Sequence, residues 1–460
     1  GKSLVFRALG YLWIKSLPNG IPKRLTSGSD FEAEPTFTSD GKNIVFVTWN
    51  DVNLGAICKV GLDGKKIIKL TTEKGIFRTP NISLDGKMIT YLKEQGNIDQ
   101  GYAFSKKSGI YTMNMSGGNA KFVAEEGEYP VFSKDGKRIF YQTGGVFFGN
   151  LTKELKSIDL NGKDERTHIK SKNANRLVPS PDNEWIAFTM LHKGYVAPLN
   201  RNGQTIDLDN NSTAVPVAEV TQIAGINLHW SPDSKNIMYT LGDSYYNSAL
   251  KDRYTFLENS PEKVEKPNNN GIKIGLTSKV DKPKGRIALT NARIITMDGD
   301  KVIENGTLII NQNRIESVGN SNDIKVPTDA LVHDLKNKTI MPGMVDAHAH
   351  IGAFRYGLTT QKNWQLYANL AFGVTTSHDP SSNTESIFTL SEMVKSGALV
   401  GPRIFSTGYI LYGAEGDFKA VINKLDDARS SVKRTKAFGA LSVKSYNQPR
   451  REQRQQILQA

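Results

Sequence analysis

The sequence predicts a multidomain fold that begins with an all-β propeller of four-stranded blades. A short β region and then a segment of alternating strands and helices follow it. Three observations support this prediction: a turn motif recurs along the first 240 residues, short strands with tight turns follow a polar linker, and strand and helix patterns alternate from residue 344 onward. A chain of 460 residues is also too long for one hydrophobic core, so two or three domains are expected.

The propeller prediction rests on five copies of one unit, such as EPTFTSDGKNIVFV at 34–47. Each copy reads as an apolar strand, a Ser-x-Asp-Gly-Lys type of turn and an alternating strand, and most are followed by a second hairpin. Two hairpins make the four strands of a blade. The turn aspartates, 45 to 51 residues apart, are Asp40, Asp85, Asp135, Asp182 and Asp233. We interpret them as turn-forming residues rather than ligands, because an aspartate that opens a turn accepts bonds from its own downstream amides.

These units resemble the repeats of TolB-type propellers over roughly residues 1–240. The resemblance implies scaffolding, substrate access or binding of a protein partner, and we assign the propeller to 1–270 without a residue-level site. The chain opens with GKSLVF, which aligns with GKNIVF at 41–46, so it is expected to begin inside a turn. The propeller is therefore predicted to be incomplete at its amino end.

Beyond residue 240 the repeat decays into a stretch rich in proline, asparagine and lysine. We interpret 271–285 as a linker that ends at VDKPKG. Short strands separated by DGD, NG and GNSND turns then occupy 286–343. This second β region leads directly into the run TIMPGMVDAHAHIG.

Two histidines, His348 and His350, close that run in a segment of strand-like alternation. On a strand they would face the same side about 6.5–7 Å apart, and Asp346 would share their face. Two imidazoles placed in this way can share one divalent metal ion. For an isolated pair of histidines, the stronger interpretation is that both lie in a core and are satisfied by hydrogen bonds. The pattern of the surrounding sequence therefore decides between this interpretation and a metal site.

That pattern is a strict alternation of helix and strand. The predicted helices lie at 360–373, 384–397, 417–438 and from about 448, and the strands between them at 374–379, 402–411 and 440–446. Alternation of this kind predicts a parallel sheet with outer helices. The histidines at the end of the first strand would then lie where barrels of this architecture keep their chemistry.

The second β region, MPGMVDAHAHIG and the βα units together resemble the amidohydrolase superfamily, in its imidazolonepropionase- and prolidase-like branch, over about 286–460. The resemblance implies a small β-sandwich flank at 286–343. It also implies that 344–460 is the first half, about four βα units, of a TIM-type (β/α)8 metal-dependent hydrolase barrel.

The resemblance also implies site residues. His348 and His350 would bind metal, and Lys444 of the fourth strand would be a carboxylated metal bridge; its alternative is a salt-bridging cation. Asp346 is expected to orient a ligand histidine or the strand end. His378 is expected either to line the pocket or to have a structural role, and Asp379 to cap a turn.

The activity implied is hydrolysis of carbon–nitrogen bonds in an amide, a cyclic amide or a dipeptide by metal-activated water. One or two zinc ions are expected, with manganese or iron possible. The superfamily's later ligands would lie beyond Ala460, so we expect a chain truncated at both ends and inactive by itself. The alternative is a non-enzymatic, propeller-based binding or scaffolding protein with a degenerate barrel.

Composition and charge also bear on the protein's partners, on cysteine-based sites and on membrane association. The net charge of +13 is spread along the chain, so no nucleic-acid partner is predicted. One cysteine, Cys58, excludes an intramolecular disulfide framework and a cysteine zinc site. No apolar run reaches the length of a membrane helix, and no signal peptide is visible. The TolB-type resemblance favours a periplasmic or secreted protein; the substrate and oligomeric state stay open.

Overall fold

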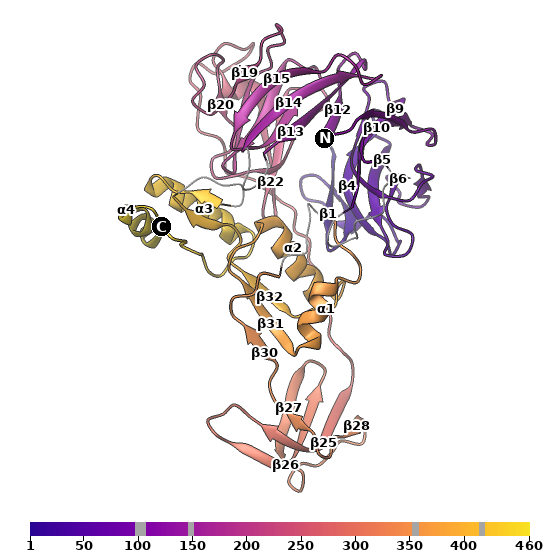
Figure 1. Cartoon of the computed structure of the whole chain (residues 1–460), viewed down its shortest axis with the longest axis vertical. Coiled ribbons are helices and arrows are strands. Elements are labelled where there is room, and N and C mark those ends of the chain that lie inside the picture. The colour runs from indigo at the N-terminus through magenta and orange to yellow at the C-terminus, as the bar shows by residue number, and fades with distance from the viewer. Residues whose placement is uncertain (97–106, 146–150, 352–357, 414–418) are drawn as a thin grey trace.

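The computed structural model describes residues 1–96, 107–145, 151–351, 358–413 and 419–460. Figure 1 shows three regions: a large group of sheets that carries the amino end, a small separate sheet at the opposite end, and a mixed β/α region between them. Antiparallel sheets dominate the described chain, and its α-helices all lie beyond residue 363. The mostly-β character predicted from the sequence is confirmed.

Six sheets follow one another along the N-terminal part of the described chain. The first has the order β1-β2-β3, the second β4-β5-β6-β7 and the third β8-β9-β10-β11. Their bounds are Ser3–Ala8, Tyr11–Ser16 and Lys23–Arg24; Phe31–Phe37, Asn43–Trp49, Ala56–Gly61 and Ile68–Lys69; and Ile76–Ile82, Met88–Glu94, Gly109–Asn114 and Lys121–Ala124.

The fourth sheet has the order β12-β13-β14-β15-β19, the fifth β16-β17-β18-β20 and the sixth β21-β22-β23-β24. Their bounds are Glu128–Phe132, Arg138–Gly144, Thr152–Asp159, Arg166–Lys172 and Ile206–Asp207; Ala174–Pro179, Trp185–Met190, Lys193–Pro198 and Ala218–Glu219; and Ile226–Trp230, Asn236–Leu241, Ser244–Ala249 and Ile272–Lys273. These are the blades that the repeat predicts. The sixth extends into the predicted linker, because β24 pairs with β23.

The repeated aspartates form turns, as the sequence predicts. Between β8 and β9, the Asp85 carboxylate accepts hydrogen bonds from the Ser83 hydroxyl and from the backbone N–H of Lys87. The same arrangement recurs at Asp40, Asp135, Asp182 and Asp233. These bonds hold the carboxylates at the hairpin, so the aspartates have a structural role that repeats from blade to blade.

The small sheet comprises β25 (Arg286–Ile295), β26 (Val302–Asn311), β27 (Arg314–Asn320), β28 (Ala330–Asp334) and β29 (Thr339–Ile340). It is mixed, since β28 and β29 run parallel to β25. One small buried cluster of this sheet consists of Ala292, Ile294, Ile303 and Leu308. Within the described residues it is a single layer, so the predicted sandwich is observed as one sheet.

The β/α region contains a parallel sheet of β30 (Met344–Asp346), β31 (Val374–Asp379) and β32 (Arg403–Ser406). The helices α1 (Trp364–Ala371) and α2 (Thr384–Lys395) follow β30 and β31. Each begins at an asparagine whose side chain accepts backbone N–H groups of the first turn, Asn363 for α1 and Asn383 for α2. Here the predicted strand and helix order is observed.

The prediction is less accurate beyond β32. The strand predicted at 402–411 divides into β32 and β33 (Ile410–Tyr412), because Gly408 turns the chain with a positive φ. In place of the helix predicted at 417–438, the described residues contain β34 (Lys419–Val421) and α3 (Leu425–Ala437). The last helix is α4 (Arg451–Gln459).

The predicted fourth strand, 440–446, forms a single parallel bridge from Ser445 to Leu411 rather than a strand. Leu441 is 86% exposed, so no core burial holds the segment extended. The prediction of a fourth strand there is wrong for the chain as described.

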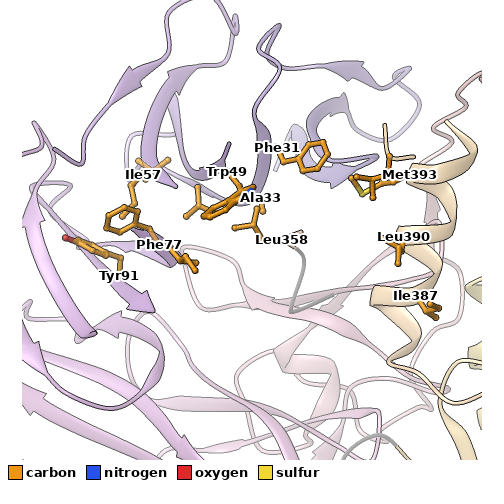
Figure 2. Close-up of a cluster of buried hydrophobic side chains, with 14 of the residues drawn as sticks. Phe31, Ala33, Trp49, Ile57, Phe77, Tyr91, Leu358, Ile387, Leu390 and Met393 are labelled. Atoms are coloured by element: carbon orange, nitrogen blue, oxygen red, sulfur yellow. The ribbon is translucent and has the colours of Figure 1, made fainter. Parts of the chain in front are cut away.

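The propeller packs directly on the β/α region. Figure 2 shows Leu390 and Met393 of α2, and Leu358, in one buried cluster with Phe31 and Trp49 of the propeller. Ala349, Ile351 and Leu358, which follow β30, therefore lie against the blades, and the carboxyl ends of the parallel strands face the propeller. This arrangement places the predicted histidines near the junction of the two regions.

Candidate functional site

The histidine pair follows β30 instead of lying on it. The strand ends at Asp346, whose carboxylate accepts a hydrogen bond of 3.0 Å from the His348 backbone N–H and so closes a turn. Pairing with β31 also stops there, at the partners Asp346 and Ser377. The prediction that strand alternation aligns the histidines is wrong, because the turn begins before the first of them.

The two imidazoles nevertheless lie side by side. The ring centroids of His348 and His350 are 5.3 Å apart, with the ring planes at 79°. Both residues are exposed, and the His350 side chain keeps 57% of its accessible surface. Exposure of this degree contradicts the alternative of histidines satisfied within a core. The site therefore consists of two neighbouring imidazoles that are open to solvent, just after the end of a parallel strand.

Asp379, at the carboxyl end of β31, lies beside the His350 imidazole. Its side chain is 1% exposed, and Oδ1 lies 3.5 Å from His350 Nδ1. The carboxylate accepts backbone N–H groups of Ile351 (3.2 Å) and Ser381 (3.0 Å). Burial raises the pKa of Asp379, while these bonds and the nearby imidazole act in the opposite direction.

The sequence suggested only the turn-capping part of this role for Asp379, and the bond to Ser381 confirms that part. Its contact with His350 is a feature that sequence reasoning missed. The available signal was its position as the last residue of a predicted strand, on the same sheet edge as the histidines.

His378 and Lys444, the other two predicted site residues, make contacts outside the histidine pair. His378 Nε2 is 3.1 Å from the Ser442 hydroxyl, and its carbonyl accepts the Ala349 backbone N–H at 3.0 Å. The Lys444 ammonium lies 5.2 Å from the centroid of the Tyr446 ring. The structure thus links β31 to the segment that carries Lys444, while the role of Lys444 as a metal bridge stays a prediction.

The side chains at this site are of the chemical types that bind divalent metals. Imidazole and carboxylate groups are the ligands that zinc, manganese and iron take from proteins. In the described part of the chain, however, no group of three or more His, Cys, Asp or Glu side chains is arranged to hold a metal. The site therefore offers two adjacent imidazoles, which would be part of a ligand set. Asp346 bonds the backbone of His348, and Asp379 lies beside the His350 ring.

Comparison with known proteins relates each region to a different relative. No family model matches the chain. It is 26% identical over 196 residues to the Tol-Pal system protein TolB of Francisella tularensis subsp. tularensis, which covers 43% of this chain and 38% of that protein. It is also 39% identical over 67 residues to imidazolonepropionase of Vibrio cholerae serotype O1, which covers 14% of this chain and 16% of that enzyme. This chain joins a TolB-like region to an imidazolonepropionase-like region.

A solved structure of a Xaa-Pro dipeptidase with bound methionine also aligns, with 21% identity and a TM-score of 0.30, over 34% of this chain and 46% of that one. The chain spans less than two fifths of the length of the TolB and imidazolonepropionase relatives reported above. No helix in the described residues is long and apolar enough to cross a membrane.

Proposed function

We propose that this chain belongs to a metal-dependent hydrolase that acts on carbon–nitrogen bonds in amides, cyclic amides or dipeptides. The observation that carries the proposal is the pair of exposed imidazoles of His348 and His350 at the carboxyl edge of a parallel sheet, with the buried carboxylate of Asp379 beside His350. The 39% identity to imidazolonepropionase over 67 residues supports the same reaction class.

We further propose that the β/α region is the first half of a (β/α)8 barrel. Three parallel strands with a helix after each of the first two support this, and so does the parallel bridge between Leu411 and Ser445. Barrel enzymes use the carboxyl ends of their strands for chemistry, which is where the histidines lie.

In this proposal the side chains have distinct tasks. His348 and His350 hold a divalent cation, zinc by preference, and Lys444 either joins them as a carbamate or stays a cation. When bound, such a cation supplies Lewis-acid activation of a carbonyl and of water. Asp379 fixes the ring of His350, and the turn closed by Asp346 positions His348.

The test measures zinc content and hydrolysis in the same preparations. His348→Ala and His350→Ala should each abolish stoichiometric zinc uptake, measured by elemental analysis after dialysis. Hydrolysis of a panel of dipeptides and small cyclic amides by a preparation that contains the complete barrel should be lost in parallel. His333→Ala is the matched control, because His333 is an exposed histidine of β28 in the separate sheet. Hydrolysis that survives His348→Ala would refute the site assignment.

A second candidate function is binding or scaffolding by the propeller, and the 196-residue similarity to TolB supports it. The two candidates differ in metal content: a scaffold with a degenerate barrel would take up no stoichiometric zinc and hydrolyse none of the panel. The TolB similarity also leads us to propose a periplasmic or secreted location, which fractionation of cells producing the protein would test.

A further inference from the structure

The described residues between β30 and α1 are held at two places. At the first place, the Ala349 N–H donates to the His378 carbonyl at 3.0 Å, and the Ile351 N–H donates to the Asp379 carboxylate at 3.2 Å. Ala349 and Ile351 are 9% and 4% exposed, whereas the two histidines that alternate with them are exposed. The orientation of the imidazoles toward solvent therefore depends on the burial of their neighbours.

At the second place, the chain is bound to the second sheet of the propeller. The Asp51 carboxylate, in the turn between β5 and β6, accepts the N–H groups of Gln361 (2.9 Å) and Lys362 (2.7 Å). The Gln361 side chain also donates to the Ser29 carbonyl at 2.8 Å. Both bonded N–H groups precede Asn363, the residue that caps α1. Asp51 thus fixes the chain that leads into the helix.

The turn that carries Asp51 is itself held in shape. The Asn50 side chain accepts the N–H groups of Val52 (2.9 Å) and Asn53 (3.0 Å). The indole Nε1 of Trp49, the last residue of β5, donates to the Asp51 carboxylate at 2.7 Å. These bonds orient the carboxylate from the propeller side, so that it presents a fixed acceptor to residues 361 and 362.

Trp49 connects the two places. Its side chain is 1% exposed and belongs to the same buried cluster as Ala349, Ile351 and Leu358. Figure 2 shows Leu358 beside Trp49 and Ala33. One propeller residue therefore packs in the core that the histidine segment shares, and also orients the carboxylate that binds the chain ahead of α1.

The histidines need this support because they lie on a turn. Sheet pairing of β30 with β31 ends at Asp346 and Ser377, before the first histidine. After that point, the hydrogen bonds of the His348, Ala349 and Ile351 N–H groups and the burial of alternate side chains hold the turn. Ligand groups that are ordered before binding take up a ligand more tightly, because less conformational entropy is lost on binding.

We propose that Trp49 and Asp51 are positioning residues for the histidine pair. They anchor the segment after β30 on the propeller, and this anchoring keeps the turn with both imidazoles ordered. The propeller is thereby a structural part of the site. The consequence for metal affinity rests on the proposed function, whereas the ordering of the turn requires no metal.

The test of ordering is hydrogen–deuterium exchange of the metal-free 460-residue chain, measured by mass spectrometry on peptides that cover 345–351 and 358–366. Trp49→Phe and Asp51→Ala should each speed exchange in both peptides, because hydrogen-bonded amides exchange when the segment opens. Trp49→Phe keeps an aromatic ring and removes the N–H that orients the Asp51 carboxylate.

The second measurement is zinc affinity, by competition with a chelator in the same preparations. Each variant should raise the dissociation constant by about tenfold, the lower end of the usual cost of losing a group that orients a metal ligand. Circular dichroism melting shows which variants are folded, and either variant alone suffices if the other does not fold.

Two variants serve as matched controls. Trp230 is a buried tryptophan of the sixth sheet, and its indole N–H donates to the Val178 carbonyl at 2.9 Å, so Trp230→Phe makes the same change far along the propeller from β5. Asp63→Ala removes a carboxylate that accepts the Lys65 N–H at the next hairpin of the second sheet. Neither control should change exchange at 345–351.

The proposal is overturned if exchange at 345–351 is unchanged in the folded Trp49 and Asp51 variants, even if it rises at 358–366. It is also overturned if Trp230→Phe speeds exchange at 345–351 equally, because a general loss of stability would then explain the effect. Faster exchange with unchanged zinc affinity would overturn the link from ordering to metal binding. Absence of zinc uptake by the parent chain would count against the proposed function alone, since the exchange result decides the positioning role without metal.

Discussion

Asp379 Oδ1 lies 3.5 Å from His350 Nδ1, and this carboxylate is almost completely buried while the imidazole is open to solvent. A buried acceptor of this kind fixes the ring of an exposed histidine and leaves its other nitrogen free. The relationship links β31 to the turn after β30, two segments that the sequence separates by helix α1.

Asp379→Asn should weaken zinc binding by about 10- to 100-fold, the usual cost of losing a carboxylate that orients a metal-bound histidine. Competition titration with a zinc chelator measures the change. Asp300→Asn, at an exposed turn of the small sheet, is the control and should leave the affinity unchanged. Equal affinity in a folded Asp379→Asn protein would contradict a role for this contact.

Leu390→Ala should destabilise the protein by about 2–5 kcal/mol, because a fully buried leucine at the contact of α2 with the propeller would leave a cavity. Leu458→Ala is a close control, since that leucine also lies on a helix but is 82% exposed. Urea unfolding of both variants measures the difference. A small effect at Leu390 would mean that the two regions do not share one core.

Asp51→Ala should loosen the junction between the propeller and α1. The Asp51 carboxylate accepts backbone N–H groups of Gln361 (2.9 Å) and Lys362 (2.7 Å), just before that helix. The same carboxylate accepts the indole N–H of Trp49 at 2.7 Å, so the variant loses three hydrogen bonds, at a cost of about 1–3 kcal/mol. Limited proteolysis should then cleave near 361 faster than in the parent chain. Asp63→Ala, at a hairpin turn, should show no such change.

His168 should make stability depend on pH. Burial, and then the nearby Arg138, lower the pKa of His168 from 6.5 to about 4. Between these values the unfolded chain binds more protons than the folded one, so this residue's effect is absent above pH 6.5 and destabilises increasingly as the pH falls toward 4.

His168→Gln should therefore reduce the loss of stability between pH 7 and pH 5. Urea midpoints at the two pH values, for this variant and for His333→Gln, measure it. An unchanged pH dependence in His168→Gln would show that the imidazole titrates normally in the folded protein.

Local patterns predicted much of this fold correctly. The turn motif located the first hairpin of five blades, because an Asp-Gly turn and flanking alternation depend only on neighbouring residues. The strand at 374–379 has the predicted bounds, and α2 starts at the predicted residue, since apolar spacing and an asparagine cap are also local. The fourth strand was not predictable in this way, because Leu441 finds no core to bury it.

The candidate site was predicted in identity but not in geometry. The pattern indicated His348 and His350 as neighbours, yet it placed them on a strand that ends at Asp346. A single side-chain bond to a backbone N–H decided that ending, and alternation contains no information about it. The sequence did not predict the contact of Asp379 with His350, because this contact depends on the pairing of β30 with β31.

By itself, the sequence determined the blades, the order of the three regions and the histidine pair, because each follows from spacing within a few tens of residues. Only the tertiary structure brought Arg7 to Glu385 and Arg434, more than 370 residues away along the chain. Charges so distant meet only after the propeller and the β/α region pack together, since burial and electrostatic balance depend on neighbours in space.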